Sequence, residues 1–496
     1  MSPLRIGAYG DGAFIDLGVE RAPDRAAQTL ALAAAIRGAW PEADVTVGGG
    51  TLAVAGVPVD EVRRLASGRA AGAGASPAIE PARSHLVAAV YDGPDLDDVA
   101  RTLGVAVEEV IARHSGAEYV VELVGFLPGF AYLAAPLGWP LAVARRPAPR
   151  PRVAAGSIGV AGSFTAIYPF ASPGGWNLLA RIIDAVPFDP DRDPPALFAP
   201  GDRVRFAVSM PGEIPLAPAP GSAAVAAVPS RGLLVVAAPA CATVQDRGRP
   251  GQLGRGIPPS GPLDPETFAA ANLAVGNDPG AAAIEVPLGA LEVEARGGPQ
   301  VVSVDGAPAV RLAEGERLRV TETERAVRYL AVGGGIDVPL VLGARATLLA
   351  ARLGGYLGRP LRRGDRLAVG NGEHPAAPAP SPPGDEALLV DPGPHLARFP
   401  LGAYEALLAG PWRVSRLGDR TGVRLEGARV PREGPDLALP APMIRGAIEI
   451  TTDGTPIVLG PDHPTTGGYP VLAVLRAASW GALARRRPGE TVRLSG

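Results

Sequence analysis

The chain has 496 residues, 47% of them hydrophobic, which is enough material for about three folded domains with sizeable cores. Its 47 basic and 50 acidic residues leave a formal net charge of −3, which provides no general attraction for nucleic acid or an anionic membrane. All basic residues are arginine, because the sequence contains no lysine. The missing lysine excludes a Walker A motif, a Schiff-base lysine, a biotinyl-lysine and a Ser-Ser-Lys amidase centre.

Cysteine usage and the first residues indicate the compartment. The one cysteine, Cys241, excludes an intramolecular disulfide and a thiolate metal cluster, as is typical of a reducing compartment. The chain starts with no long apolar segment, and no run of about 18 apolar residues follows. We therefore expect a cytoplasmic protein with no membrane segment.

The predicted elements of the first half form two units. Residues 1–80 read as a small α+β lobe, with a helix over 24–38 where apolar residues recur at helical spacing. Residues 81–210 read as mostly β, with strands at Leu86–Val90 and Tyr119–Val124 and a helix at Val107–His114.

The second half is predicted as two β-rich lobes bounded by linkers. Residues 211–229 and 373–385 are rich in proline and alanine, the composition of semi-rigid spacers. The lobe at 230–372 contains strands at Leu233–Ala237 and Val301–Val304. Its helix at Pro265–Val275 is preceded by Asp264, an N-cap residue. The last lobe covers 386–496.

Similar short sequence segments, called phrases below, lie at the end of each of these β-rich units. They are PGDRVRF at 200–206, RRGDRLAV at 362–369 and RPGETVRL at 487–494, with a further copy, AEGERLRV, at 313–320. A Gly-acid turn followed by alternating apolar and arginine residues predicts a tight turn into a half-buried strand. The recurrence indicates related β lobes, each ending on a similar strand.

His114 is one candidate for chemistry. None of the five histidines has the spacing of a zinc pair, and no dense Asp-x-Asp loop is present, so we expect no structural metal. At the end of its predicted helix, His114 is favoured as an imidazolium by the helix dipole. It could instead act as a proton donor or acceptor near the following strand, and spacing alone does not decide between these interpretations.

Two glycine- and aromatic-rich segments follow. Residues 125–133 place aromatic residues around a Pro-Gly turn, and residues 173–176 read Pro-Gly-Gly-Trp. Gly174 and Gly175 would let backbone amides approach a ligand beside the indole of Trp176. The segments could therefore form pocket walls, or simply turns and core.

Residues 243–251, TVQDRGRPG, open the second half with two arginines among glycines. Arg247 and Arg249, beside Asp246, could form an anion nest for a phosphate or carboxylate. The alternative is a solvated turn with a surface ion pair.

Several longer phrases carry a family resemblance. VELVGFLPGFAYL, GSIGVAGSFTAIYPFASPGGWNLLAR and the closing PGDRVRF resemble the allophanate hydrolase subunit 1-like family, also called the 5-oxoprolinase B subunits. ATVQDRGRPGQLGRGIPPSGPLDPETFAAANLAVGNDPG, VGGGIDVPLVLGARAT, RLGDRTGVRLEG and GPDHPTTGGYPVLAVL resemble the partner family, the subunit 2-like proteins or 5-oxoprolinase C subunits. The resemblance covers nearly the whole chain and implies a natural B/C fusion. It also implies a mainly β protein with an α+β N-terminal lobe and several cyclophilin-like β-barrel lobes.

The resemblance implies three kinds of function. The first is ATP-dependent hydrolysis of 5-oxoproline to glutamate with a separate LamB/YcsF-type A subunit, with Mg²⁺ arriving in complex with ATP. The second is the carboxyltransferase role of a urea carboxylase-like biotin system, with the biotin parts on other chains. The third is a non-catalytic role as a kinase inhibitor or its antagonist. We expect the first; the sequence leaves the oligomeric state open, a homo-oligomer included.

Candidate site residues carried over from the resemblance should lie between the two halves, where domain clefts favour small molecules. The candidate catalytic residues are His114, Asp264 and Arg345. The candidate substrate- or nucleotide-binding residues are Gly174, Gly175, Trp176, Asp246, Arg247, Arg249, Asn272, Thr465, Thr466 and Tyr469. The chain departs from the family pattern at Ala344 and Ala346, where serines are expected, and at Glu449, where glutamine is usual, so its substrate could differ from the family norm.

Overall fold

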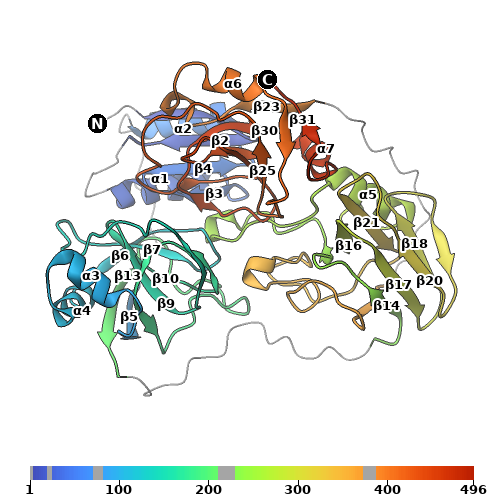
Figure 1. Ribbon diagram of the computed structural model, residues 1–496, viewed down its shortest axis with the longest axis horizontal. Coiled ribbons are helices and arrows are strands. Elements are labelled where there is room, and N and C mark those ends of the chain that lie inside the picture. Colours follow the sequence, from blue (N-terminus) through green and yellow to red (C-terminus); the bar gives the residue numbers. More distant parts are fainter. Residues whose placement is uncertain (1–3, 19–24, 71–81, 211–228, 372–386) are drawn as a thin grey trace.

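The computed structural model describes residues 4–18, 25–70, 82–210, 229–371 and 387–496. The predicted linker 373–385 and nearly all of the linker 211–229 lie outside these residues. Figure 1 shows four lobes: an N-terminal lobe (4–70), a first barrel (82–210), a middle lobe (229–371) and a C-terminal lobe (387–496). The mainly β fold expected from the sequence is confirmed.

The N-terminal lobe is the predicted α+β unit. Its sheet has the order β1-β2-β4-β3, with two helices packed against it. The elements are β1 (Arg5–Tyr9), β2 (Gly12–Asp16), α1 (Arg25–Ala39), β3 (Asp44–Val47), β4 (Thr51–Ala55) and α2 (Val59–Ala70). Apolar residues of α1, β2, β3 and β4 share one core with the aromatic side chains of the first barrel.

The first barrel is a closed sheet of seven strands in the order β10-β7-β6-β13-β5-β12-β9. A short pair, β8 with β11, lies beside it. The elements are β5 (Ser84–Val90), α3 (Leu96–Leu103), α4 (Val107–Ser115), β6 (Tyr119–Val124), β7 (Ala131–Ala134), β8 (Arg150–Val153), β9 (Ser157–Ala161), β10 (Phe164–Ile167), β11 (Ser172–Gly174), β12 (Asn177–Ile182) and β13 (Arg203–Val208).

The middle lobe folds as two sheets around one apolar core, with the orders β20-β17-β14-β22 and β15-β16-β21-β18-β19. Its elements are β14 (Gly232–Ala237), β15 (Thr243–Gln245), η1 (Leu253–Arg255), α5 (Pro265–Ala274), β16 (Ala283–Pro287), β17 (Leu291–Arg296), β18 (Gln300–Val304), β19 (Val310–Leu312), β20 (Arg317–Val320), β21 (Val327–Val332), η2 (Leu349–Ala351) and β22 (Arg366–Ala368).

The C-terminal lobe is an eight-stranded sheet in the order β31-β24-β25-β28-β27-β30-β23-β32. Its elements are β23 (Leu388–Pro392), η3 (Leu396–Arg398), α6 (Ala403–Ala409), β24 (Trp412–Val414), β25 (Gly422–Glu426), β26 (Ala441–Pro442), β27 (Ala447–Ile450), β28 (Pro456–Leu459), β29 (Thr466–Gly467), β30 (Val471–Leu475), η4 (Ala477–Ser479), α7 (Trp480–Ala484), β31 (Thr491–Val492) and β32 (Leu494–Ser495).

The recurrent phrases close these lobes as predicted. In the first barrel and the middle lobe the strand of the last phrase pairs with the lobe's first strand, β13 with β5 and β22 with β14. In the C-terminal lobe the phrase contains β31, which pairs with β24, and ends at Leu494 of β32, which pairs with the first strand β23. The fourth copy forms β20, which pairs with β17 inside the middle lobe. Similar residues recur because each lobe must bring its ends together, and a half-buried strand after a tight turn does so.

The N-terminal and C-terminal lobes pack against each other. Figure 1 shows the N-terminal lobe beside the C-terminal lobe, with the first barrel beneath them and the middle lobe to one side. Tyr9, Phe14 and Ala53 pack with residues of β26, β27, β28 and β30 in one buried cluster. The Gly49 amide also donates to the Pro440 carbonyl at 2.8 Å. This packing positions the site described next.

Candidate functional site

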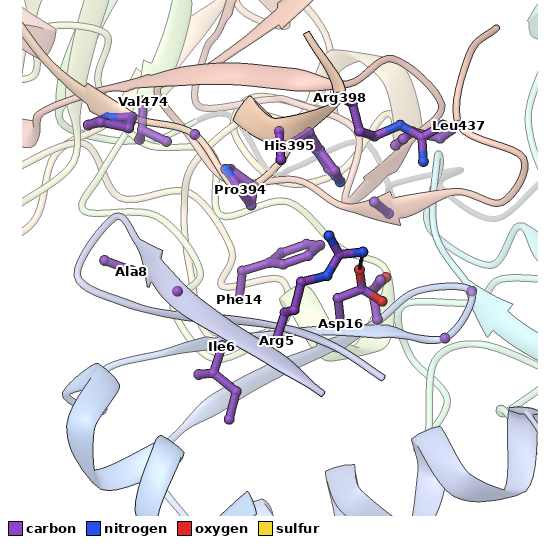
Figure 2. A pocket seen from close by; sticks show the side chains of 18 of the residues that line it. Arg5, Ile6, Ala8, Phe14, Asp16, Pro394, His395, Arg398, Leu437 and Val474 are labelled. Atoms are coloured by element: carbon purple, nitrogen blue, oxygen red, sulfur yellow. Dashed lines mark hydrogen bonds and ion pairs between the residues drawn. The ribbon is translucent and has the colours of Figure 1, made fainter. Parts of the chain in front are cut away.

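A pocket of about 580 Å³ lies between the N-terminal and C-terminal lobes, within the size range of small-molecule sites. One wall comes from β1, β2 and the turn before β4; the other comes from residues 391–398, the loop 437–441 and β30. Figure 2 shows Arg5, Phe14 and Asp16 facing His395 and Arg398 across it. We call this space the inter-lobe pocket; both halves of the chain line it, as expected of a ligand site.

The wall from the N-terminal lobe is a β-hairpin. Gly10, at φ +62°, makes the tight turn between β1 and β2 and puts Arg5 directly opposite Asp16. The two side chains form an ion pair at 3.0 Å between Nη2 and Oδ2. Phe14, on the same strand as Asp16, packs edge-on against the His395 ring, with 5.2 Å between ring centroids.

The opposite wall is built around His395, which follows the Pro-Gly turn after β23. Its Nδ1 accepts a hydrogen bond from the Val471 amide of β30 at 3.0 Å. Burial, together with the positive charges of Arg398 and Arg5, lowers the pKa of His395 to about 4. The imidazole is therefore neutral at physiological pH. Since Nδ1 accepts, its one proton lies on Nε2.

The pocket residues were not among the candidates from the sequence. Arg5 and Asp16 lie in the first 16 residues, whereas His395 and Arg398 lie about 380 residues later, and no local spacing relates the two groups. A weak signal was present in DPGPH at 391–395, where a Pro-Gly turn after a strand brings a histidine to a lobe edge.

Asp246 holds together two loops of the middle lobe, the loop after β15 and the segment around residues 345–346. Its carboxylate accepts from the amides of Gly248, Arg345 and Ala346, which ties the loop after β15 to residues 345–346. Arg345 then donates through Nε to the Val338 carbonyl and forms an ion pair with Asp337 at 2.9 Å. The structure thus brings Asp246 and Arg345 together as neighbours.

The two candidate arginines of the TVQDRGRPG segment lie in different environments, one exposed and one buried. Arg247 is exposed and pairs with Asp278 at 2.7 Å, which matches the surface ion-pair alternative. Arg249 is 1% exposed and donates to the Val341 and Ala346 carbonyls, while its Nη1 has no hydrogen-bond partner among the described residues. Burial lowers the pKa of Arg249, against the opposing charges of Asp246 and Asp462.

The Gly-Gly-Trp turn belongs to an aromatic cluster of the first barrel. Trp176 is buried against Phe130 and Tyr132, with ring centroids 5.8 Å away in each case. A Cβ on Gly174 would come within 2.4 Å of the Tyr168 hydroxyl, so this close approach requires glycine. Gly175 accepts from the Arg146 amide.

The Thr-Thr-Gly-Gly-Tyr segment lies against this cluster. A Cβ on Gly125 would meet Thr466 Oγ1 at 2.1 Å, which places the strand β29 directly on the first barrel. The hydroxyls of Thr465 and Thr466 are buried without a hydrogen-bond partner in the described part of the chain. Tyr469 is half-buried, with the Arg432 guanidinium 5.9 Å from its ring centroid.

Asp264 and Asn272 have structural partners in and around α5. Asp264 caps the helix by accepting from the Thr267 amide at 3.2 Å, as predicted, and pairs with Arg485 of α7 at 2.9 Å. Asn272 donates to the Ala281 carbonyl and accepts from Asn277. Both side chains are fully buried, and neither lines the inter-lobe pocket.

His114 lies inside the first barrel and not between the halves. Its ring is 0% exposed, bonded to the Tyr91 and Thr165 hydroxyls and stacked on Phe206. Burial lowers the pKa of His114 to about 3. The imidazolium expected from the helix dipole is therefore wrong, because desolvation outweighs a dipole effect of about 1 kcal/mol.

Acid should weaken the first barrel through His114. The unfolded chain takes up a proton near pH 6.5, whereas the folded barrel stays neutral to about pH 3, so stability falls as pH drops through this window. We expect the wild type to lose about 2 kcal/mol through this group between pH 7 and pH 5. His114→Gln should lose that part of the pH dependence in urea unfolding. If the variant lost as much stability between pH 7 and pH 5 as the wild type does, this prediction would be contradicted.

The three departures from the family pattern are all buried. Ala344 and Ala346 are 0% exposed, and the Ala346 amide donates to Asp246 at 3.1 Å. Glu449 of β27 is 9% exposed, and burial, aided by the negative charge of Asp436, raises its pKa to about 7. A carboxyl in place of the usual glutamine thus takes up a proton near neutral pH.

Neither a metal-binding cluster nor a membrane-spanning helix is present in the described ranges. Within them, no three His, Cys, Asp or Glu side chains lie together as a metal site. In the same ranges, no helix is long and apolar enough to cross a membrane.

Comparison with known proteins matches both halves to one family. Residues 4–198 match the family model described as carboxyltransferase domain, subdomain C and D, and residues 255–495 match the one described as subdomain A and B. The structure superimposes on a crystal structure of the protein TTHA0988 with a TM-score of 0.84 and 32% sequence identity, covering 98% of this chain and 99% of that one.

The curated relatives include two different subunits of 5-oxoprolinase and a urea amidolyase. The C subunit of 5-oxoprolinase from Escherichia coli K12 is 34% identical over 280 residues, which are 52% of this chain and 89% of that protein. The B subunit of 5-oxoprolinase from Escherichia coli O157:H7 is 45% identical over 135 residues, which are 26% of this chain and 61% of that protein. The urea amidolyase of Lachancea kluyveri is 30% identical over half of this chain but only 16% of its own length.

Proposed function

Because the chain belongs to the carboxyltransferase-domain family, with halves related to the B and C subunits of 5-oxoprolinase, we propose that it is the fused B/C component of an ATP-dependent 5-oxoprolinase. In this proposal it activates the lactam of 5-oxoproline with ATP. Ring opening to glutamate then occurs together with a separate LamB/YcsF-type A subunit. The protein would work in the cytoplasm.

One observation carries this proposal: both subunit types are present in a single chain and share a ligand-sized pocket. A fusion fixes the two halves at a one-to-one ratio, which suits a stable catalytic complex. The inter-lobe pocket takes one wall from the half related to the B subunit and the other from the half related to the C subunit. A pocket lined by both halves supports a joint action of the two.

The proposed chemistry begins at the lactam, an unactivated amide. The lactam oxygen attacks the γ-phosphorus of ATP, the bond to the β,γ-bridging oxygen breaks, and ADP leaves. Water then adds to the activated ring carbon and the C–N bond breaks, which gives an acyl phosphate. A second water attacks the same carbon, and inorganic phosphate departs with the former lactam oxygen.

The phosphate charge in this reaction needs cations or amides that this chain can supply. Since the chain has no lysine, arginine guanidinium groups, backbone amides and the Mg²⁺ of the nucleotide complex would meet that charge.

A second candidate function is carboxyl transfer in a urea carboxylase-like biotin system. It is favoured by the relative named urea amidolyase, 30% identical over 293 residues, and by the description of the matched family. The biotin and its carboxylase would then come from other chains, because this one has no lysine to carry biotin.

ADP release distinguishes the two functions. Purified protein is given Mg-ATP with and without 5-oxoproline, then with a LamB/YcsF-type A subunit added. We expect 5-oxoproline to stimulate ADP release and glutamate to form only when the A subunit is present. No ATP turnover in any combination, together with carboxyl transfer from carboxybiotin to urea, would replace the first function by the second.

A further inference from the structure

His395 presents a fixed hydrogen-bond donor to the inter-lobe pocket. Its ring is 9% exposed and is held by the Val471 amide on Nδ1 and by the edge-on contact with Phe14. The remaining ring nitrogen, Nε2, carries the proton and makes no hydrogen bond with the described part of the chain. Figure 2 shows the ring directed into the space between the two lobes. A protonated ring nitrogen at the pocket with no acceptor in the described part of the chain can donate to a ligand or to water.

Two arginines lie near this donor. Arg5 and Arg398 both line the pocket and both act on His395 as like charges. Two acids also line it, but each is paired: Asp16 with Arg5 at 3.0 Å, and Asp391 with Arg476 at 2.6 Å. Neither acid therefore faces Nε2 as an uncompensated negative charge, and the guanidinium of Arg5, which meets Asp16 through Nη2, keeps other N–H groups that can donate to an anion.

The size of this charge indicates a singly charged anion. A nucleotide triphosphate would need several cations or a nest of amides around its phosphates, whereas the residues lining the pocket include two arginines. Phe14, Leu437 and Val474 supply an apolar surface beside the charged end. We propose that the inter-lobe pocket binds the carboxylate of a small organic acid, with His395 Nε2–H as the hydrogen-bond donor and Arg5 and Arg398 as the charge partners.

The identity of the acid as 5-oxoproline rests on the function proposed above. That molecule has one carboxylate, an apolar ring and a lactam able to donate and accept. Carboxylate recognition itself depends only on the pocket.

Binding to the full chain is measured by isothermal titration calorimetry with three probes. 5-Oxoproline carries the carboxylate, 2-pyrrolidinone is the same lactam without it, and ADP tests a phosphate ligand. The test variant is His395→Asn, whose side-chain oxygen can still accept from the Val471 amide while the Nε2 donor is lost. Arg398→Met removes a charge partner. The matched control is Arg429→Met, an exposed arginine of the same lobe that pairs with Asp453 away from the pocket.

We expect 5-oxoproline to bind at least 10-fold more tightly than 2-pyrrolidinone. His395→Asn and Arg398→Met should each weaken its binding by about 10- to 100-fold, the usual effect of one hydrogen bond to a charged group. Arg429→Met should bind as the wild type does. Equal binding of both lactams, or wild-type binding by His395→Asn, would overturn the carboxylate site, and competition by ADP would assign the pocket to phosphate. Binding without ADP release would keep the site and overturn the oxoprolinase function.

Discussion

Replacing Arg420 by methionine should lower the free energy of unfolding of the C-terminal lobe by about 3–5 kcal/mol. Arg420 is 7% exposed and donates to Glu285, Asp462 and the Gly261 carbonyl. Glu285 and Gly261 belong to the middle lobe, so this one guanidinium joins two lobes. Without it, two buried carboxylates lose their counter-charge.

A neighbouring cation does not replace Arg420. Arg445 lies close enough for the charges of Glu285 and Asp462 to act on it, but the hydrogen bond it makes in the described part of the chain goes to neither carboxylate. Its Nη2 donates to the Leu263 carbonyl and its guanidinium lies over the Trp480 ring. Urea unfolding followed by tryptophan fluorescence measures the loss.

The matched control is Arg247→Met. This arginine is also in an ion pair, but both partners are more than 60% exposed, and such pairs contribute about 0–1 kcal/mol. Equal stability of the two variants would show that the buried network does not hold the lobes together.

The double variant His395→Asn/Arg398→Met should raise the KM for 5-oxoproline by about 10²–10³-fold in the assay with the A subunit. The hydrogen bond and the charge both act on the carboxylate, which does not change during ring opening. Their loss therefore removes binding that is shared by the ground state and the transition state, and kcat should fall much less than kcat/KM.

Oxoproline-stimulated ADP release, measured over a wide range of 5-oxoproline concentration, separates the two parameters. The Arg429→Met variant again controls for the loss of one charge. A double variant with unchanged KM and a low kcat would contradict a carboxylate-binding role and would place these residues in the reaction step instead.

The sequence predicted those parts of the fold that local patterns determine. The closing phrases predicted the last strand of each lobe, because a Gly-acid turn and alternating residues specify that geometry within a few positions. The helix α5 and its Asp264 cap could be predicted equally well, since an Asp before Pro at a helix start accepts hydrogen bonds from the amides of the first turn. The middle lobe, with two sheets around one core, was not distinguished from the barrels.

The pocket could not be predicted, for a physical reason. Its walls come from residues 5–51 and 391–474, and only the docking of two lobes through a shared apolar cluster brings them together. The candidates taken from motifs were instead mostly residues that hold loops and lobes in place. Asp246 accepts hydrogen bonds from three backbone amides in two loops of the middle lobe. His114 is buried in the core of the first barrel.

Hydrolysis of 5-oxoproline labelled with oxygen-18 at the lactam oxygen tests the proposed ATP-dependent step most directly. The protein, a LamB/YcsF-type A subunit and Mg-ATP are incubated with the labelled substrate, and the inorganic phosphate and glutamate are examined by mass spectrometry. If ATP phosphorylates the lactam oxygen, one labelled oxygen appears in each phosphate and none of it in the new carboxylate of glutamate. Unlabelled phosphate, with the label kept in glutamate, would contradict the proposed route, in which phosphate departs with the former lactam oxygen.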